Sequence, residues 1–232
     1  MRDAGCVIFD LDGTLADTSS DLIGAANACF RALGHGSLLD PMADQATAFA
    51  GGRAMLRLGF ARLGRVDEAA VEAEFPRLLD FYAADIARHT VIYPGAVTAV
   101  EQLLAEGYRV GICTNKPHYL AEELLQRLGV RSLFASLVGA DTLAVKKPHA
   151  APFFEAVRRA GGAPERALLV GDTVTDRECA RAAGVPCLLV TFGPEGRAIE
   201  RLAPEGLLED YALLGARVRA LIGRKARRAG SA

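Results

Sequence analysis

The segment Cys6-Val7-Ile8-Phe9-Asp10-Leu11-Asp12-Gly13-Thr14 decides the fold of this chain. Its first four residues are apolar and predict a short buried strand, and the carboxylates of Asp10 and Asp12 follow where that strand ends. In open α/β sheets, ligands collect at the carboxyl ends of the strands. Because two carboxylates so close together repel each other, we expect a cation that prefers oxygen ligands to lie between them.

The composition sets limits on the class of protein. The chain has 232 residues, enough to bury a full core in one large domain or two smaller ones. Its formal net charge of -1 gives no reason to expect a nucleic acid as partner. The first residues do not resemble a signal peptide, and no apolar run is long enough to cross a bilayer. We therefore expect a cytoplasmic protein that binds neither nucleic acid nor membrane; the oligomeric state is unknown.

The five cysteines form no CxxC pair, and each lies in an apolar strand-like or helical pattern. An odd number of cysteines fits poorly with a disulfide framework, so we expect buried free thiols in a reducing compartment. The basic cluster of residues 224–228 lies at the C-terminus and is expected to be a solvated tail.

Residues 17–90 differ in character from the rest of the chain. This stretch is rich in alanine, lacks a convincing β-branched run and repeats apolar residues at helical spacing, as in residues 22–33. Gly34 is expected to end this first helix, and a later helix is expected over residues 67–88 despite Pro76. We interpret residues 17–90 as an all-helical insertion.

Strands and helices alternate after Tyr93. The expected strands are 109–113, 137–138, 167–170 and 187–190, and the expected helices end at 106 or cover 119–128, 151–160 and 175–183. This alternation predicts βαβ units, a parallel sheet and helices on both of its faces. The predicted fold class is therefore α/β, with a Rossmann-like parallel sheet core in residues 1–16 and 91–232. A helical cap domain, residues 17–90, is inserted between the first and second core strands.

Polar groups follow the expected strands at their carboxyl ends. Thr114-Asn115-Lys116 follows one strand, Asp172 and Asp176 follow another, and Lys147 precedes a helix. Carboxylates, a hydroxyl and an ammonium group suit phosphoryl transfer, in which catalysis is mostly positioning and charge neutralisation.

Four segments resemble the motifs of the haloacid dehalogenase-like (HAD) superfamily, in the family's order. They are D-x-D-G-T at 10–14, the apolar strand ending in Thr-Asn at Thr114, Lys-Pro at Lys147, and G-D-T-x-x-D at 171–176. The resemblance covers nearly the whole chain and implies the HAD-like fold. Residues 17–22, the run 114–117 and the small helical cap are similar to phosphoglycolate phosphatases within that superfamily.

The resemblance implies roles for the carboxylates. Asp10 would attack phosphorus and form an aspartyl-phosphate, and Asp12 would be the general acid and then the general base. Mg²⁺ would be held by the side chains of Asp10 and Asp172 and by the backbone carbonyl of Asp12. Asp176 would hold a metal-bound water or orient Lys147.

The remaining matched residues would surround the phosphoryl group. The hydroxyl of Thr114 and the amide of Asn115 would bond to phosphoryl oxygens, and Lys147 would balance the carboxylates as a point charge. Gly13 and Thr14 are further expected substrate-binding residues. Thr173 is expected to lie behind the residues that contact the metal and the substrate, without contacting either itself. It keeps a hydroxyl where serine is common in the family.

Asp12 discriminates within the superfamily. Dehalogenases and phosphonatases do not keep this second carboxylate, phosphonatases use a cap lysine, and residues 17–90 contain no lysine. The resemblance therefore implies a phosphatase acting on a small phosphomonoester, with 2-phosphoglycolate as best guess. Alternatives are a sugar phosphomutase, which shares Asp12, or a phosphatase for a nucleotide, a sugar phosphate or pyrophosphate.

Substrate choice is expected to reside in the cap, because the core residues recognise only the phosphoryl group. A substrate carboxylate calls for a cation, and Arg53, which follows two glycines, is the candidate. A solvated arginine at a helix start is the competing interpretation. Lys116 and His118 are weaker candidates.

Two unrelated classes of protein remain as alternatives. A calcium loop starting at Asp10 would need glycine where Leu15 stands. A response-regulator receiver domain has two adjacent acids after its first strand, whereas Leu11 separates the acids here. Phosphate release from a small phosphoester would distinguish an enzyme from a receiver domain.

Overall fold

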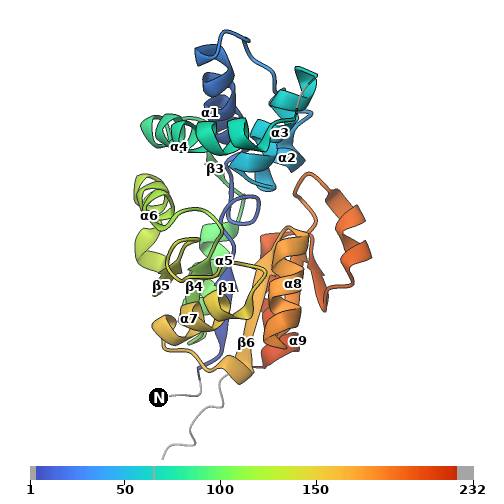
Figure 1. Cartoon of the computed structure of the whole chain (residues 1–232). Coiled ribbons are helices and arrows are strands. Elements are labelled where there is room, and N and C mark those ends of the chain that lie inside the picture. Colours follow the sequence, from blue (N-terminus) through green and yellow to red (C-terminus); the bar gives the residue numbers. More distant parts are fainter. Residues whose placement is uncertain (1–3, 65, 224–232) are drawn as a thin grey trace, which may run out of the picture. The chain divides into compact units, whose positions relative to one another are not determined.

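The computed structural model describes residues 4–64 and 66–223, so the predicted basic tail lies outside the described residues. The chain divides into two compact units (Figure 1). We call Met1–Leu15 with Tyr93–Ala232 the sheet unit and Ala16–Ile92 the insertion unit. The insertion leaves and rejoins the sheet unit at neighbouring points, because the backbone N–H of Tyr93 donates to the carbonyl oxygen of Leu15 over 3.0 Å.

A six-stranded sheet forms the centre of the sheet unit. Its strands are β1 (Cys6–Phe9), β4 (Arg109–Cys113), β5 (Ser136–Val138), β6 (Ala167–Gly171), β7 (Cys187–Val190) and β8 (Gly206–Leu208). Their spatial order is β5-β4-β1-β6-β7-β8, and every neighbouring pair is parallel. All four residues of β1 are buried, as a parallel strand covered on both faces requires. The predicted α/β fold class is confirmed.

Helices cover both faces of this sheet (Figure 1). They are α5 (Ala96–Ala105), α6 (His118–Arg127), α7 (Ala150–Ala160), α8 (Val174–Ala183) and α9 (Leu214–Ile222). α7 and α8 pack together over one face, in a core that includes Cys6 and Ile8 of β1. Val7 and Phe9 point to the opposite face because side chains alternate along a strand, and there α5 packs against β4 and α9 against β6.

The predicted elements after Tyr93 agree with the structure to within one residue at each end, but β8 and α9 were not predicted. β8 is a three-residue edge strand without a β-branched residue, so its sequence carries little strand signal. α9 follows after only a short turn and contains a glycine in its nine residues.

Among the described residues of the insertion unit, four helices lie between two short strands. They are β2 (Ala16–Asp17), α1 (Ser19–Ala32), α2 (Gln45–Phe49), α3 (Gly52–Arg62), α4 (Glu68–Ala84) and β3 (Val91–Ile92). α1 packs against α4, and the rings of Phe30 and Phe60 meet edge to face at 5.4 Å. Pro76 lies inside α4 without ending it, as predicted.

The helix predicted over 67–88 ends earlier, at Ala84. Asp85 leaves the helical conformation, with φ of -138°, and beyond it the carboxylate of Asp21 accepts hydrogen bonds from the backbone N–H groups of His89 and Thr90. These two N–H groups therefore bond to a side chain of α1 rather than to a helix carbonyl. The hydroxyl of Thr90 also donates to Asp21, over 2.7 Å.

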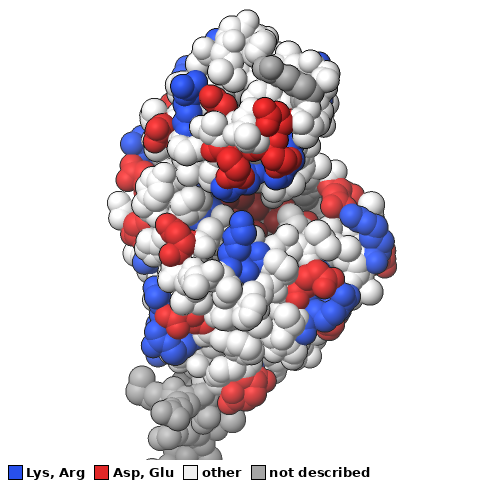
Figure 2. All heavy atoms as spheres, in the orientation of Figure 1, with Lys and Arg blue, Asp and Glu red and all other residues white. Residues whose placement is uncertain are grey.

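All five cysteines lie among the described residues and are buried free thiols, as predicted. Burial raises the pKa of the Cys6 thiol to about 12, so it stays protonated at neutral pH. On the face drawn in Figure 2, acidic and basic side chains are interspersed, in agreement with the net charge of -1. Among the described residues, no helix has the length and apolar character of a membrane span.

Candidate active site

The carboxyl ends of the central strands bring the predicted residues together. Phe9 of β1 is level with Ile112 of β4 on one side and with Val170 of β6 on the other. The residues that follow these three positions therefore leave the sheet at the same edge. The backbone N–H of Asp10 still donates to the carbonyl oxygen of Val170, over 2.8 Å, which fixes the start of the loop.

Asp10 is buried at the centre of this edge. Its Oδ1 accepts a hydrogen bond from the Leu11 backbone N–H over 2.8 Å and lies 3.0 Å from Nζ of Lys147. Burial raises the pKa of Asp10 to about 6, and Asp176 and Asp12 add to the rise while Lys147 opposes it. Positive charge at this position therefore favours the carboxylate form that a nucleophile needs.

Lys147 is a buried cation beside Asp10 and Asp176. Its Nζ lies 2.6 Å from Oδ1 of Asp176, and the two side chains are 1% and 0% exposed. Burial opposes the charge of Lys147, but the Asp10 and Asp176 carboxylates outweigh it, so its pKa stands well above the ordinary value. Oδ2 of Asp176 accepts from the hydroxyl and the N–H of Thr173 in a capping box at the start of α8. The two carboxylate oxygens of Asp176 therefore contact Lys147 on one side and Thr173 on the other.

Asp172 is held by the loop that carries Asp10. The hydroxyl of Thr14 donates to Oδ1 of Asp172 over 2.9 Å. Gly13 has φ of +77°, and a Cβ there would lie 2.2 Å from Oδ2 of Asp172, so only glycine fits. Burial raises the pKa of Asp172 well above its usual value, and the Asp176 and Asp10 carboxylates raise it further.

These side chains fit a divalent cation. Ligand oxygens of Asp10, Asp172 and Asp176 lie within 4.8 Å of one another. Asp176 is already engaged with Lys147 and Thr173, which leaves Asp10 and Asp172 as the pair whose repulsion a cation would relieve. An all-oxygen set of carboxylates is the ligand chemistry of Mg²⁺.

The carboxylate of Asp12 does not belong to this cluster, because it turns to Lys116. Nζ of Lys116 lies 2.8 Å from Oδ1 of Asp12, and the Lys116 side chain is buried. Sequence reasoning missed this pair and considered Lys116 only as a weaker candidate for a substrate carboxylate. The sequence feature that could have revealed this pair is the position of each residue after its strand. Lys116 follows the end of β4 by three residues, as Asp12 follows the end of β1, and the two strands are neighbours.

Thr114 and Asn115 lie at the end of β4. Thr114 is buried, and its Oγ1 accepts a hydrogen bond from the backbone N–H of Lys116 over 3.2 Å. The side-chain amide of Asn115 donates to the carbonyl oxygen of Lys147 over 3.0 Å. Asn115 therefore joins the β4 loop to the loop that carries the buried lysine.

Arg53 belongs to the insertion unit, near the start of α3. Its Nε and Nη2 bond to the two carboxylate oxygens of Glu72, over 2.6 and 2.8 Å. The guanidinium lies 3.7 Å from the ring centre of Phe75. The side chain is 38% exposed. Arg53 is thus a partly exposed arginine whose guanidinium is already paired with a carboxylate in bidentate geometry. His118 lies in the sheet unit, at the start of α6, where its backbone N–H donates to Asp141.

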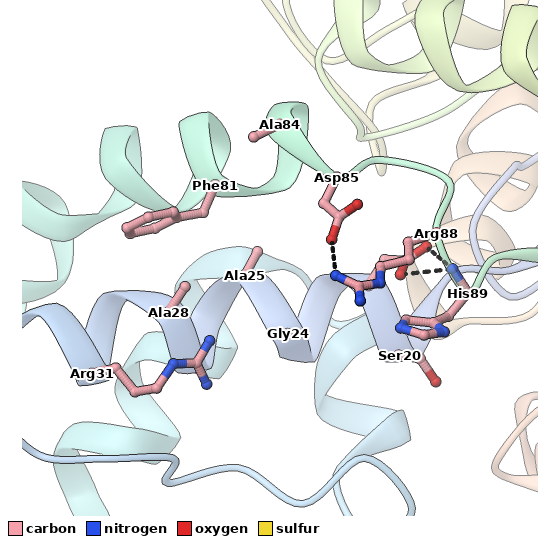
Figure 3. A pocket seen from close by; sticks show the side chains of 11 residues that line it. Ser20, Gly24, Ala25, Ala28, Arg31, Phe81, Ala84, Asp85, Arg88 and His89 are labelled. Atoms are coloured by element: carbon pink, nitrogen blue, oxygen red, sulfur yellow. Dashed lines mark hydrogen bonds and ion pairs between the residues drawn. The ribbon is translucent and has the colours of Figure 1, made fainter.

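A cavity of about 330 Å³ lies in the insertion unit, between α1 and α4 (Figure 3). Ala25 and Ala28 line it from α1, and Phe81 and Ala84 from α4. It contains none of the predicted site residues. Its charged groups are bonded within the unit, including Arg88 to Asp85 at 3.1 Å and Arg31 to the hydroxyl of Ser37 at 2.9 Å.

The chain is similar to known proteins over most of its length. The chain is 36% identical over 211 residues to a phosphoglycolate phosphatase of Agrobacterium fabrum, which covers 89% of each chain. It is 38% identical over 216 residues to a phosphoglycolate phosphatase of Rhodospirillum rubrum, covering 90% of this chain and 88% of the relative.

Among solved structures, a predicted phosphoglycolate phosphatase from Haemophilus somnus superposes with a TM-score of 0.78 at 23% identity. The match covers 94% of this chain and 99% of the other, and it shows a shared fold. Residues 7–190 match the family model described as haloacid dehalogenase-like hydrolase. With the relatives at 36% and 38% identity, this match shows that the chain belongs to the haloacid dehalogenase-like hydrolase family.

Proposed function

We propose that this hydrolase is a Mg²⁺-dependent phosphatase of 2-phosphoglycolate that works through an aspartyl-phosphate on Asp10. The broader statement follows from its family and relatives: the chain is a phosphoric monoester hydrolase. The observation that carries the mechanism is the placement of Asp10 beside the buried Lys147 and near Asp172. The relatives named phosphoglycolate phosphatase support the choice of substrate.

In the first half-reaction, an Asp10 carboxylate oxygen forms a bond to phosphorus while the bond from phosphorus to the leaving oxygen breaks. Lys147 neutralises charge beside Asp10, 3.0 Å from Oδ1. Asp12 gives its proton to the leaving oxygen. Thr114, Asn115 and the Gly13–Thr14 turn contact the phosphoryl oxygens.

In the second half-reaction, Asp12 takes a proton from a water molecule whose oxygen attacks phosphorus. The bond between phosphorus and Asp10 breaks, inorganic phosphate leaves, and both carboxyl groups return to their starting states. The contact of Lys116 with Asp12 holds that side chain in place across both half-reactions.

Asp10 and Asp172, with the backbone carbonyl of Asp12, would hold Mg²⁺. When bound, the ion supplies charge neutralisation between the carboxylates and the phosphoryl group. Treatment with a chelator is therefore expected to reduce phosphate release to the uncatalysed level, and added Mg²⁺ to restore it. The control is chelator already saturated with Mg²⁺. Full activity after chelation and dialysis would contradict the metal dependence.

The experiment that tests the substrate assignment is a comparison of kcat/KM over small phosphoesters. We expect 2-phosphoglycolate to exceed sugar phosphates, nucleotides and pyrophosphate. A requirement for a bisphosphate activator, with isomerised sugar phosphate as product, would instead identify a phosphomutase. A higher kcat/KM for another monoester would overturn the assignment to 2-phosphoglycolate and leave the phosphatase mechanism standing.

We propose further that the insertion unit is the cap that selects the substrate and that Arg53 binds its carboxylate. Arg53→Ala is expected to raise KM for 2-phosphoglycolate about tenfold, because a charge-assisted hydrogen-bonded pair is lost. KM for p-nitrophenyl phosphate, which has no carboxylate, should stay within about twofold on the same reasoning.

The matched control is Arg57→Ala. Arg57 forms an equivalent bidentate pair with Glu68 in the same unit, over 2.7 Å for both bonds. Its loss should leave both KM values unchanged. If Arg53→Ala raises the two KM values equally, or if Arg57→Ala has the same selective effect, Arg53 does not recognise the carboxylate.

A further inference from the structure

Tyr211 contacts the catalytic loop from a distant part of the sequence. It lies beyond residues 7–190, the range that matches the family, and follows the edge strand β8. Its hydroxyl donates a hydrogen bond to the carbonyl oxygen of Thr14 over 2.6 Å, and the residue is only 2% exposed. The segment 10–14 therefore has a partner that no motif includes.

The ring of Tyr211 has a fixed position. It packs against Phe192 with ring centres 5.5 Å apart, and Phe192 packs against Tyr93 at 4.7 Å. On another side its Cβ lies close to Gly95, where an added Cβ would come within 3.3 Å. Close packing on several sides holds the hydroxyl at one place, so the bond to Thr14 restricts the backbone there.

Thr14 joins this hydroxyl to the candidate metal site. Its carbonyl oxygen accepts from Tyr211, and its own hydroxyl donates to Oδ1 of Asp172 over 2.9 Å. Tyr211, Thr14 and Asp172 thus form a continuous hydrogen-bonded and covalent connection within the sheet unit. Groups behind metal ligands fix the orientation of those ligands, and their loss typically weakens metal binding about 10- to 100-fold.

We propose that Tyr211 is a positioning residue for the metal site: by holding the Thr14 backbone, it keeps the Thr14 hydroxyl aimed at Asp172. The inference rests on the proposed function, in which Asp172 is a ligand of Mg²⁺. Burial, with Tyr93 and Asp172, raises the pKa of Tyr211 well above its usual value, so its hydroxyl remains a donor.

The test is Tyr211→Phe, which removes the hydroxyl and keeps the ring. The chain offers a matched control in Tyr108→Phe. The Tyr108 hydroxyl also donates to a backbone carbonyl over 2.6 Å, that of Gly223, and the residue is 3% exposed. Tyr108 directly precedes β4, at the opposite end of that strand from Thr114, so its hydroxyl has no part in the site.

Mg²⁺ binding to the full chain without substrate is measured by titration calorimetry, with melting temperatures recorded in parallel. We expect Tyr211→Phe to weaken Mg²⁺ binding about tenfold, and Tyr108→Phe to leave it unchanged. The Mg²⁺ concentration that half-saturates phosphate release should rise by the same factor, while kcat at saturating Mg²⁺ stays within about twofold.

Equal Mg²⁺ affinity in the two variants would overturn the role of Tyr211 and leave the proposed function intact. A Tyr211→Phe protein that does not fold would also overturn it, because the hydroxyl would then serve the fold. An unmodified protein that binds no Mg²⁺ would overturn this inference and the proposed metal dependence together.

Discussion

Asp10→Asn is expected to lower phosphate release by at least about 10⁴-fold, the scale on which enzymes lose activity when a covalent nucleophile is removed. The asparagine side chain can keep the contact with the Leu11 backbone N–H, since its carbonyl oxygen can replace Oδ1. It has no negative charge with which to attack phosphorus. The fold should therefore survive, because the substitution keeps the shape of the side chain.

The measurements are phosphate release from 2-phosphoglycolate and the melting temperature. Asp67→Asn is the control, because Asp67 begins α4 as its N-cap and asparagine serves that position equally well. We expect the control to retain both activity and stability. Removal of a nucleophile leaves a residual activity far below about a hundredth of the original. If Asp10→Asn keeps more than that fraction, Asp10 is not the nucleophile.

Lys147→Ala is expected to abolish measurable turnover and to lower the free energy of unfolding by about 3–5 kcal/mol. Lys147 lies between the carboxylates of Asp10 and Asp176, at 3.0 and 2.6 Å. Without it, both carboxylates remain buried without their compensating charge. Each is then driven to take up a proton, and a protonated Asp10 is a poor nucleophile.

The two effects of Lys147→Ala can be separated. Urea unfolding gives the change in stability, and phosphate release at a temperature where the variant is fully folded gives the change in activity. Lys146→Ala is the control, because Lys146 is the preceding residue and is exposed. A folded Lys147→Ala variant with near-normal turnover would rule out the proposed neutralisation of Asp10.

The sequence predicted the sheet and its helices because their signals are local. The apolar run 110–113 is flanked by Arg109 and Thr114, and β4 covers Arg109–Cys113, the predicted range. Three-residue β8 has no comparable signal, since an edge strand gains its stability from pairing with β7 rather than from its own residues. The bonds from the backbone N–H groups of His89 and Thr90 to Asp21 join residues more than sixty positions apart, which no local signal shows.

The sequence predicted which residues gather at the candidate site, but not which side chains pair with each other there. Asp10 and Asp172 lie close together because β1 and β6, the strands that precede them, are neighbours in the sheet. The order of the motifs along the chain was enough to predict this proximity. The pairing of Lys116 with Asp12 and the contact of Tyr211 with Thr14 depend on side-chain directions and on chain folding after residue 190. The sequence identified Arg53 as a candidate cation but gave no indication that it pairs with Glu72, because nothing in the sequence distinguishes Glu72 from other charged residues of α4.

The antiparallel pairing of β2 with β3 brings the two ends of the insertion unit together, with Ala16 opposite Ile92. The two chain segments that connect the insertion unit to the sheet unit therefore lie next to each other. A domain tolerates an inserted segment well when the two ends of that segment lie close together. Residues 16–92 can accordingly change in length and composition as a module. Changes confined to this module could then alter the choice of substrate, while the strands that hold Asp10 and Asp172 stay the same.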